Sequence, residues 1–268
     1  MRRITILSLC TLAAALGAAP FAAAQTASGY RYLFQMTGAG SDDLHGVTEV
    51  LGAAARVDLE RQGSDSQYFL VSNAGRTITI VHPETREYSV VDDTTFERLV
   101  GSVLHAMPVV DIRVTNSSVT SDALGAGAAI AGHPTTGYRV TQDFTVAIGA
   151  FGVTASTIHQ RVTTDYWIAT DLTLPHNPLI TLLSQVETVL AQTDRTFAHK
   201  TEAALRPFAT GTPLKIEVRS ETTGNDQQTD VKTQVLEVSS VTRAPVDPRR
   251  LALPAGYTRK DPGMNLKF

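Results

Sequence analysis

The sequence has a single cysteine, Cys10, and it lies in a segment that we expect the mature protein to lose. Without it the chain has no disulfide and no thiol nucleophile. Cys10 follows Leu9 in the middle of an apolar run, whereas a lipid-anchoring cysteine follows a complete run and small residues. A chain of this length can bury a core without disulfides.

The first 24 residues have the three parts of a secretory signal peptide in the expected order. Two arginines come first, an apolar run covers residues 4–16, and three alanines at 22–24 precede Gln25. The alternative is an uncleaved membrane anchor, but a spanning helix needs roughly 20 apolar residues, and this run is shorter. We therefore expect cleavage near Ala24–Gln25, a periplasmic or secreted protein, and a single domain over residues 25–268.

Charged residues are also few, at 18% of the chain, and they are scattered along it. Loss of Arg2 and Arg3 with the signal changes the net charge from −3 to −5. The absence of a basic stripe argues against nucleic-acid binding. No later apolar run is long enough to span a bilayer, so we expect no membrane span after cleavage.

The usual signatures of catalysis are missing as well. None of the seven histidines stands near another at metal-ligand spacing, and no nucleophile elbow occurs. The glycine-rich segment 125–132 has Ile130 where a dinucleotide fingerprint needs its third glycine, and His133–Pro134 follow it where a phosphate loop has Lys and Ser or Thr. We predict that the protein is not an enzyme and has no cofactor and no metal site; segment 125–132 is expected to be a turn between strands.

The sequence is rich in Val, Thr and Ile, in stretches separated by Gly, Asn and Asp, a pattern typical of antiparallel strands joined by turns. The mature chain shows about ten such stretches. They cover residues 30–37, 47–60, 67–71, 77–81, 86–91, 109–119, 137–148, 153–170, 212–219 and 230–241. The tail, residues 247–257, is expected to lie along a sheet edge.

Two segments have helical spacing of apolar residues. The first runs from about Thr94 to Pro108, and the second opens at residues 175–178 and extends as far as Phe208. Their apolar positions are Phe96, Leu99, Val100, Val103 and Leu104 in the first, and Leu179, Leu182, Leu183, Val186, Val189 and Leu190 in the second. The predicted fold is mainly β with two helices (α+β): a curved antiparallel half-barrel sheet of about ten strands, covered by the helices, with an apolar cavity between them.

Three parts of the chain together resemble a known family. They are residues 52–58, residues 130–140 with the later strand 166–169, and residues 251–257. In this order they resemble exported bacterial proteins of unknown function related to the outer-membrane lipoprotein carrier (LolA-like) superfamily. The resemblance covers nearly all of the mature chain, in short matches. It implies a half-open barrel closed by helices, a cavity that holds acyl chains or lipids in carrier relatives, and a recurrent arginine in the strand that holds Arg56.

The leading functional hypothesis is a periplasmic binding protein that shelters a lipid, an acyl chain or another apolar ligand. The candidate ligand contacts are Arg56, Trp167, Leu99, Val103, Leu183 and Val186. Arg56 has the alternative role of an ordinary ion-paired residue, and Trp167 that of a core anchor. The alternative function is a non-catalytic structural or interaction protein of the cell envelope, with a sheet edge that docks a partner protein. Strand register decides which residues point inward, and the sequence does not supply it.

Overall fold

The computed structural model describes residues 26–38, 44–60, 67–73, 77–92, 110–150, 153–172, 195–206 and 211–261. Twelve strands form one sheet in the order β12-β6-β5-β4-β3-β2-β1-β11-β10-β9-β8-β7. The strands are β1 (Ala27–Thr37), β2 (Leu44–Leu51), β3 (Ala54–Glu60), β4 (Tyr68–Ser72), β5 (Thr77–His82), β6 (Glu87–Asp92), β7 (Val110–Ala126), β8 (Thr135–Ala150), β9 (Val153–Ala169), β10 (Thr212–Thr223), β11 (Thr229–Val246) and β12 (Thr258–Arg259).

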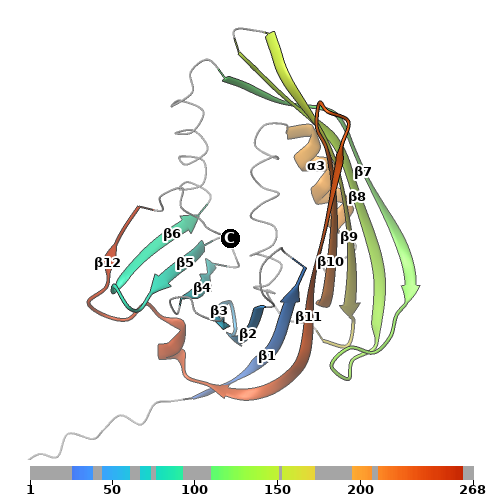
Figure 1. Ribbon diagram of the computed structural model, residues 1–268. Helices are drawn as coiled ribbons and strands as arrows, with labels where there is room; N and C mark the ends of the chain where they lie inside the picture. Colours follow the sequence, from blue (N-terminus) through green and yellow to red (C-terminus); the bar gives the residue numbers. More distant parts are fainter. Residues whose placement is uncertain are drawn as a thin grey trace, which may run out of the picture.

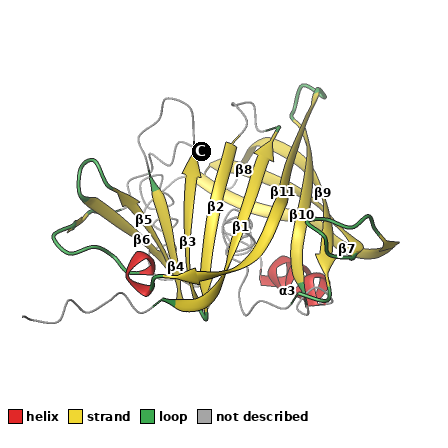
Figure 2. Cartoon of the chain, turned by 90° about the horizontal axis from the view of Figure 1, so that it is seen from below, coloured by secondary structure: helices red, strands yellow, loops and turns green. Residues whose placement is uncertain are grey.

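The sheet is strongly curved and does not close on itself (Figures 1 and 2). Short strands β1–β6 form one half, long strands β7–β11 form the other, and β1 joins the halves by pairing antiparallel with β11. All pairs are antiparallel except β12 with β6, which makes the sheet mixed. The prediction of a mainly β fold with an antiparallel curved sheet is confirmed.

The strand count exceeds the expected ten because one predicted strand is two. The stretch 47–60 folds as the hairpin β2–β3, with a turn at Gly52 and Ala53. Gly52 has φ +57°, a conformation that glycine adopts without a steric penalty. The short strand β12 is the other addition. Strands β8 and β9 pair antiparallel up to Ala150 and Val153.

The described residues contain one α-helix, α3 (Arg195–Leu205), instead of the two expected. It falls in the later part of the second predicted helical region. Its Phe197 packs against Phe144 of β8 with ring centroids 5.1 Å apart, and both rings are almost fully buried. The first predicted helix, 94–107, and the apolar stripe 179–190 lie outside the described residues, and so do Leu99, Val103, Leu183 and Val186. No helix in the described ranges is long and apolar enough to cross a lipid bilayer.

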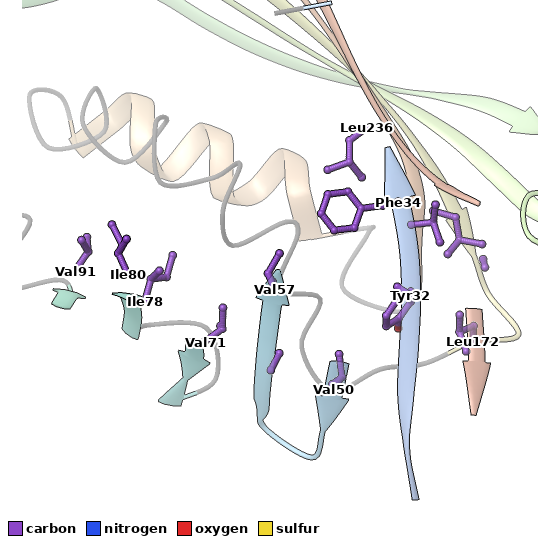
Figure 3. Packing of buried hydrophobic residues seen from close by; sticks show 14 residues of the cluster. Tyr32, Phe34, Val50, Val57, Val71, Ile78, Ile80, Val91, Leu172 and Leu236 are labelled. Atoms are coloured by element: carbon purple, nitrogen blue, oxygen red, sulfur yellow. The ribbon is translucent and has the colours of Figure 1, made fainter. Parts of the chain in front are cut away.

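Side chains alternate between the two faces of the sheet, and α3 identifies the inner one. Ala204 of α3 belongs to a buried cluster with Ile216 of β10. Ile216 pairs with Leu236 of β11, which belongs to the larger cluster on β1–β6 and β9–β11. The two clusters therefore share one face, on the inner side of the curve where α3 lies (Figures 1 and 3).

The chain after β11 forms a strap on the outer face of β2–β6. The 3-10 helix η3 (Pro248–Leu251) opens it, with the Asp247 side chain accepting the amide of Arg249 as an N-cap. Tyr257 then packs on an outer cluster of Tyr68, Leu70 and Val81. The strap ends in β12, beside β6 at the edge of the sheet. Residues 247–257 were expected along a sheet edge, but η3 and Tyr257 lie over the outer face, and only β12, which follows them, lies at the edge.

Candidate ligand-binding face

The inner face of the sheet is apolar over a wide area. The buried cluster in Figure 3 contains Tyr32, Phe34, Val50, Ala55, Val57, Val71, Ile78, Ile80, Val91, Ala169, Leu172, Leu214, Leu236 and Val238. These residues come from nine strands and the segment after β9. Because side chains two apart along a strand share a face, alternation places the members on β1–β6, β10 and β11 on one side. Ala169 and Leu172 join them from the end of β9 and the segment after it. The pairing register of the strands decides which side of the sheet these residues face, so the sequence alone did not identify the inner face.

Two hydroxyl groups interrupt this apolar surface. Tyr32 and Thr48 pair directly across β1 and β2 and are 2% and 0% exposed. Neither the Tyr32 hydroxyl nor the Thr48 hydroxyl has a hydrogen-bond partner among the described residues. A buried hydroxyl without a partner destabilises a fold by about 1–3 kcal/mol. Burial, and then the nearby Tyr30, raise the pKa of Tyr32 far above its usual range.

At one end of β1 the inner face becomes charged. Arg243 of β11 pairs with Tyr30 of β1, two residues before Tyr32 on the same face. Its Nε donates to the Tyr30 hydroxyl at 3.4 Å, and its guanidinium carbon lies 5.6 Å from the centre of the Tyr30 ring. Arg243 is exposed and Tyr30 is half-buried. A cation and an aromatic ring thus stand at the rim of the apolar face.

Arg56, the arginine singled out in the sequence, lies on the outer face. It alternates with the buried inner residues Ala55 and Val57 on β3. The Arg56 Nε donates to both carboxylate oxygens of Asp58 at 2.9 Å. The guanidinium carbon lies 3.6 Å from the centre of the Tyr68 ring. Burial lowers the pKa of Arg56, but the hydrogen bond and the charge of Asp58 outweigh this, so the pKa is raised overall.

The strap adds a second arginine to this outer group. Arg250 of η3 donates to Glu49 of β2 at 3.1 Å and lies 3.5 Å from Asp58. Glu49 is 8% exposed, and its other carboxylate oxygen has no hydrogen-bond partner among the described residues. The outer charge cluster of Glu49, Arg56, Asp58 and Arg250 therefore balances two positive against two negative charges. Here Arg56 has the role of an ion-paired residue under the strap, which was the alternative considered for it.

Trp167 also lies on the outer face, because its neighbours Tyr166 and Ile168 belong to the inner clusters. Its ring covers Gly137 of β8: a Cβ built on Gly137 would lie 2.5 Å from Trp167 Cζ3. The structure therefore does not bring Arg56 and Trp167 together with the apolar inner face. The role of either residue in ligand binding stays a prediction.

A polar hollow of about 380 Å³ lies on the outer face of β8, β9 and β10. It is lined by Arg139, Thr141, Arg161, Thr163, Asp165, Glu217, Arg219 and Glu221. Arg139 makes two hydrogen bonds of 2.6 Å to Asp165, which raise the pKa of the guanidinium. Arg219 pairs with Glu221 at 2.9 Å. Charges that neutralise one another across strands are typical of a solvated sheet face.

No three His, Cys, Asp or Glu side chains in the described part of the chain are grouped to hold a metal ion. In comparisons with known proteins, the chain matches no family model and no curated protein. The residues that sequence reasoning missed are Tyr32, Thr48 and Arg243. The sequence signal for Tyr32 is the alternation of Tyr30, Tyr32 and Phe34 along β1, which predicts three aromatic side chains on one face of the strand. This alternation does not show which hydroxyl groups have a hydrogen-bond partner.

Proposed function

We propose that the protein is an exported binding protein that shelters an apolar ligand, such as a lipid or an acyl chain, against the inner face of its sheet. The observation that carries the proposal is the contrast between the two faces. The inner face presents one apolar cluster from β1 to β5 and across to β11. The outer face of β8–β10 carries paired charges. Burial of an acyl chain provides about 0.8 kcal/mol per CH₂ group.

The proposal includes the architecture and location expected from the sequence. In it, the curved sheet is a half-barrel with α3 on its inner side. The signal peptide at 1–24 directs the chain to the periplasm, where lipids and lipoprotein acyl chains are available. The resemblance to lipoprotein carriers supports the same ligand class.

Ligand uptake is tested by native mass spectrometry of protein purified from a periplasm, followed by titration of the delipidated protein with a fluorescent fatty acid. We expect co-purifying lipid and saturable uptake. A clean apo mass together with no uptake would contradict the proposal. Met36→Gln places an amide on the inner face beside the apolar cluster and should weaken uptake. Leu33→Gln is the matched control, because Leu33 lies on the outer face of the same strand and is 41% exposed.

The second candidate is an envelope interaction protein that docks a partner on a sheet edge. The two-residue strand β12 covers one end of the sheet, whereas the 17-residue strand β7 ends the strand order at the other. An edge strand of this length offers backbone groups for strand addition. A pull-down from envelope extract tests it: a partner that protects the amides of β7 supports this function, and no partner above background contradicts it.

A further inference from the structure

Two hydroxyls on the inner face, which have no partner among the described residues, point to the chemistry of the ligand. Tyr32 and Thr48 lie directly opposite each other on neighbouring strands. Side chains in such pairs have Cβ atoms roughly 5 Å apart, so both side chains start from the same part of the inner face. Buried polar groups in proteins nearly always have a hydrogen-bond partner. Two neighbouring exceptions therefore call for a polar group that arrives with a ligand.

The surroundings of this pair favour an uncharged polar group. Thr48 is opposite Val57 on β3, and Tyr32 is opposite Val241 on β11. The buried cluster around them contains only apolar and aromatic side chains among the described residues. An ionised group loses its hydration in such a place. The raised pKa of Tyr32 has the same cause, and it leaves the phenol protonated and able to donate.

Polarity changes stepwise along β1. Tyr30 with Arg243 stands at the rim, Tyr32 with Thr48 comes next, and Phe34 with Val238 follows. Successive residues on one face of a strand are roughly 6.7 Å apart. A charged rim, a hydroxyl layer and an apolar interior match, in order, the head group, the linkage and the chain of an amphiphile.

We infer that the ligand is an ester-linked acyl lipid, whose ester carbonyl accepts hydrogen bonds from the hydroxyls of Tyr32 and Thr48. This inference rests on the proposed binding function. A carbonyl oxygen has two lone pairs and needs no acceptor in return, so it satisfies both hydroxyls. The acyl chain then lies over Phe34 and Val238, and the head group points to Arg243 at the rim.

The test compares two lipids that differ only at the linkage. Delipidated protein is titrated calorimetrically with 1-palmitoylglycerol, which has an ester carbonyl, and with 1-O-hexadecylglycerol, in which a methylene replaces the carbonyl. We expect the wild-type protein to bind the ester more tightly. Tyr32→Phe and Thr48→Val should each reduce that preference roughly two- to tenfold, the effect of one hydrogen bond, without weakening binding of the ether.

Thr212→Val is the matched control. Thr212 is 0% exposed like Thr48, but its hydroxyl donates to the Leu172 carbonyl at 2.7 Å. This variant should keep the ester preference and unfold at a lower temperature than wild type. Thr48→Val should unfold at the same or a higher temperature, because it removes a hydroxyl without a partner. If Thr48→Val is destabilised as much as Thr212→Val, the Thr48 hydroxyl already has a partner, such as an ordered water, and the inference is overturned.

The two proposals fail in different ways. Equal binding of the ester and the ether, or an ester preference that survives both Tyr32→Phe and Thr48→Val, overturns the ester linkage and leaves the binding function standing. No binding of either lipid, nor of the fluorescent fatty acid, overturns the binding function itself.

Discussion

Arg250 and Glu49 are 201 residues apart in the sequence, and their side chains meet at 3.1 Å. The contact fastens η3, the first part of the strap, to β2 on the outer face. Arg250 is half-exposed, whereas the Glu49 side chain is only 11% exposed. The buried carboxylate therefore takes its hydrogen bond from the strap, while Arg56, directly opposite on β3, adds a second positive charge.

Removal of this arginine should destabilise the protein. Arg250→Ala removes the hydrogen-bond donor of Glu49 and the contact to Asp58, and it leaves Arg56 as the one arginine of the outer charge cluster. We therefore expect a loss of about 1–3 kcal/mol in the free energy of unfolding, measured with urea. Arg249→Ala is the control, because the Arg249 side chain is 66% exposed and lies 3.9 Å from Asp247; its effect should stay within about 0.5 kcal/mol. In the Glu49→Gln background, Arg250→Ala should have a smaller effect. Equal losses in the two arginine variants would show that the strap does not depend on Glu49.

A methyl group at Gly137 should disturb the only tryptophan. The Trp167 ring occupies the space in which an alanine Cβ would lie, so Gly137→Ala forces the ring outward and should destabilise the fold by about 1–3 kcal/mol. Tryptophan fluorescence should shift to longer wavelength as the ring becomes more exposed. Gly224→Ala is the control, since its Cβ would meet only the flexible Asp226 side chain at 3.2 Å. An unchanged emission spectrum in Gly137→Ala would contradict this packing.

The strands were predictable because each rests on a local pattern. Alternation between turn residues located most of them. The split of 47–60 was missed because Gly52 follows an apolar run with no Asn or Asp beside it. A hairpin there depends on the positive φ of that one residue.

The site was less predictable because it depends on register and on distant segments. Arg56 was a candidate because the family resemblance implies an arginine in this strand, but its neighbours Tyr68 and Arg250 come from β4 and η3. A shift of one residue in the pairing of β3 would turn the Arg56 side chain from the outer face to the inner face. The hydroxyl of Tyr32 is unusual only because of what surrounds it in the folded chain, and no sequence pattern records the absence of a partner.

Alkaline pH should destabilise the protein through Tyr32. Burial raises the pKa of Tyr32 in the folded state, while the unfolded chain has the ordinary tyrosine value of about 10. The stabilising contribution is therefore complete below about pH 10 and is lost as the pH rises toward the folded-state pKa, because the unfolded state ionises first. Urea midpoints measured from pH 8 to 11 should fall more steeply for the wild type than for Tyr32→Phe. If the urea midpoints of the wild type and Tyr32→Phe fell equally with pH, Tyr32 would not be buried from water as it is in the structure.

Acid pH should release β12 from the sheet edge. Lys260 lies 2.6 Å from Glu87, and this hydrogen bond is the main cause that lowers the pKa of the Glu87 carboxyl. A lowered folded-state pKa means that the contribution is present above the ordinary glutamate pKa and is lost as the pH falls through the folded-state value. The backbone pairing of β12 is short, with the Thr258 amide bonded to Arg86 and the Lys260 amide to Tyr88. We expect the hydrogen-exchange protection of these two amides to fall below about pH 4, relative to the amides of the central strand β4. Glu87→Gln should show the lower protection already at neutral pH, and protection that does not change with pH in the wild type would show that backbone pairing alone holds this edge.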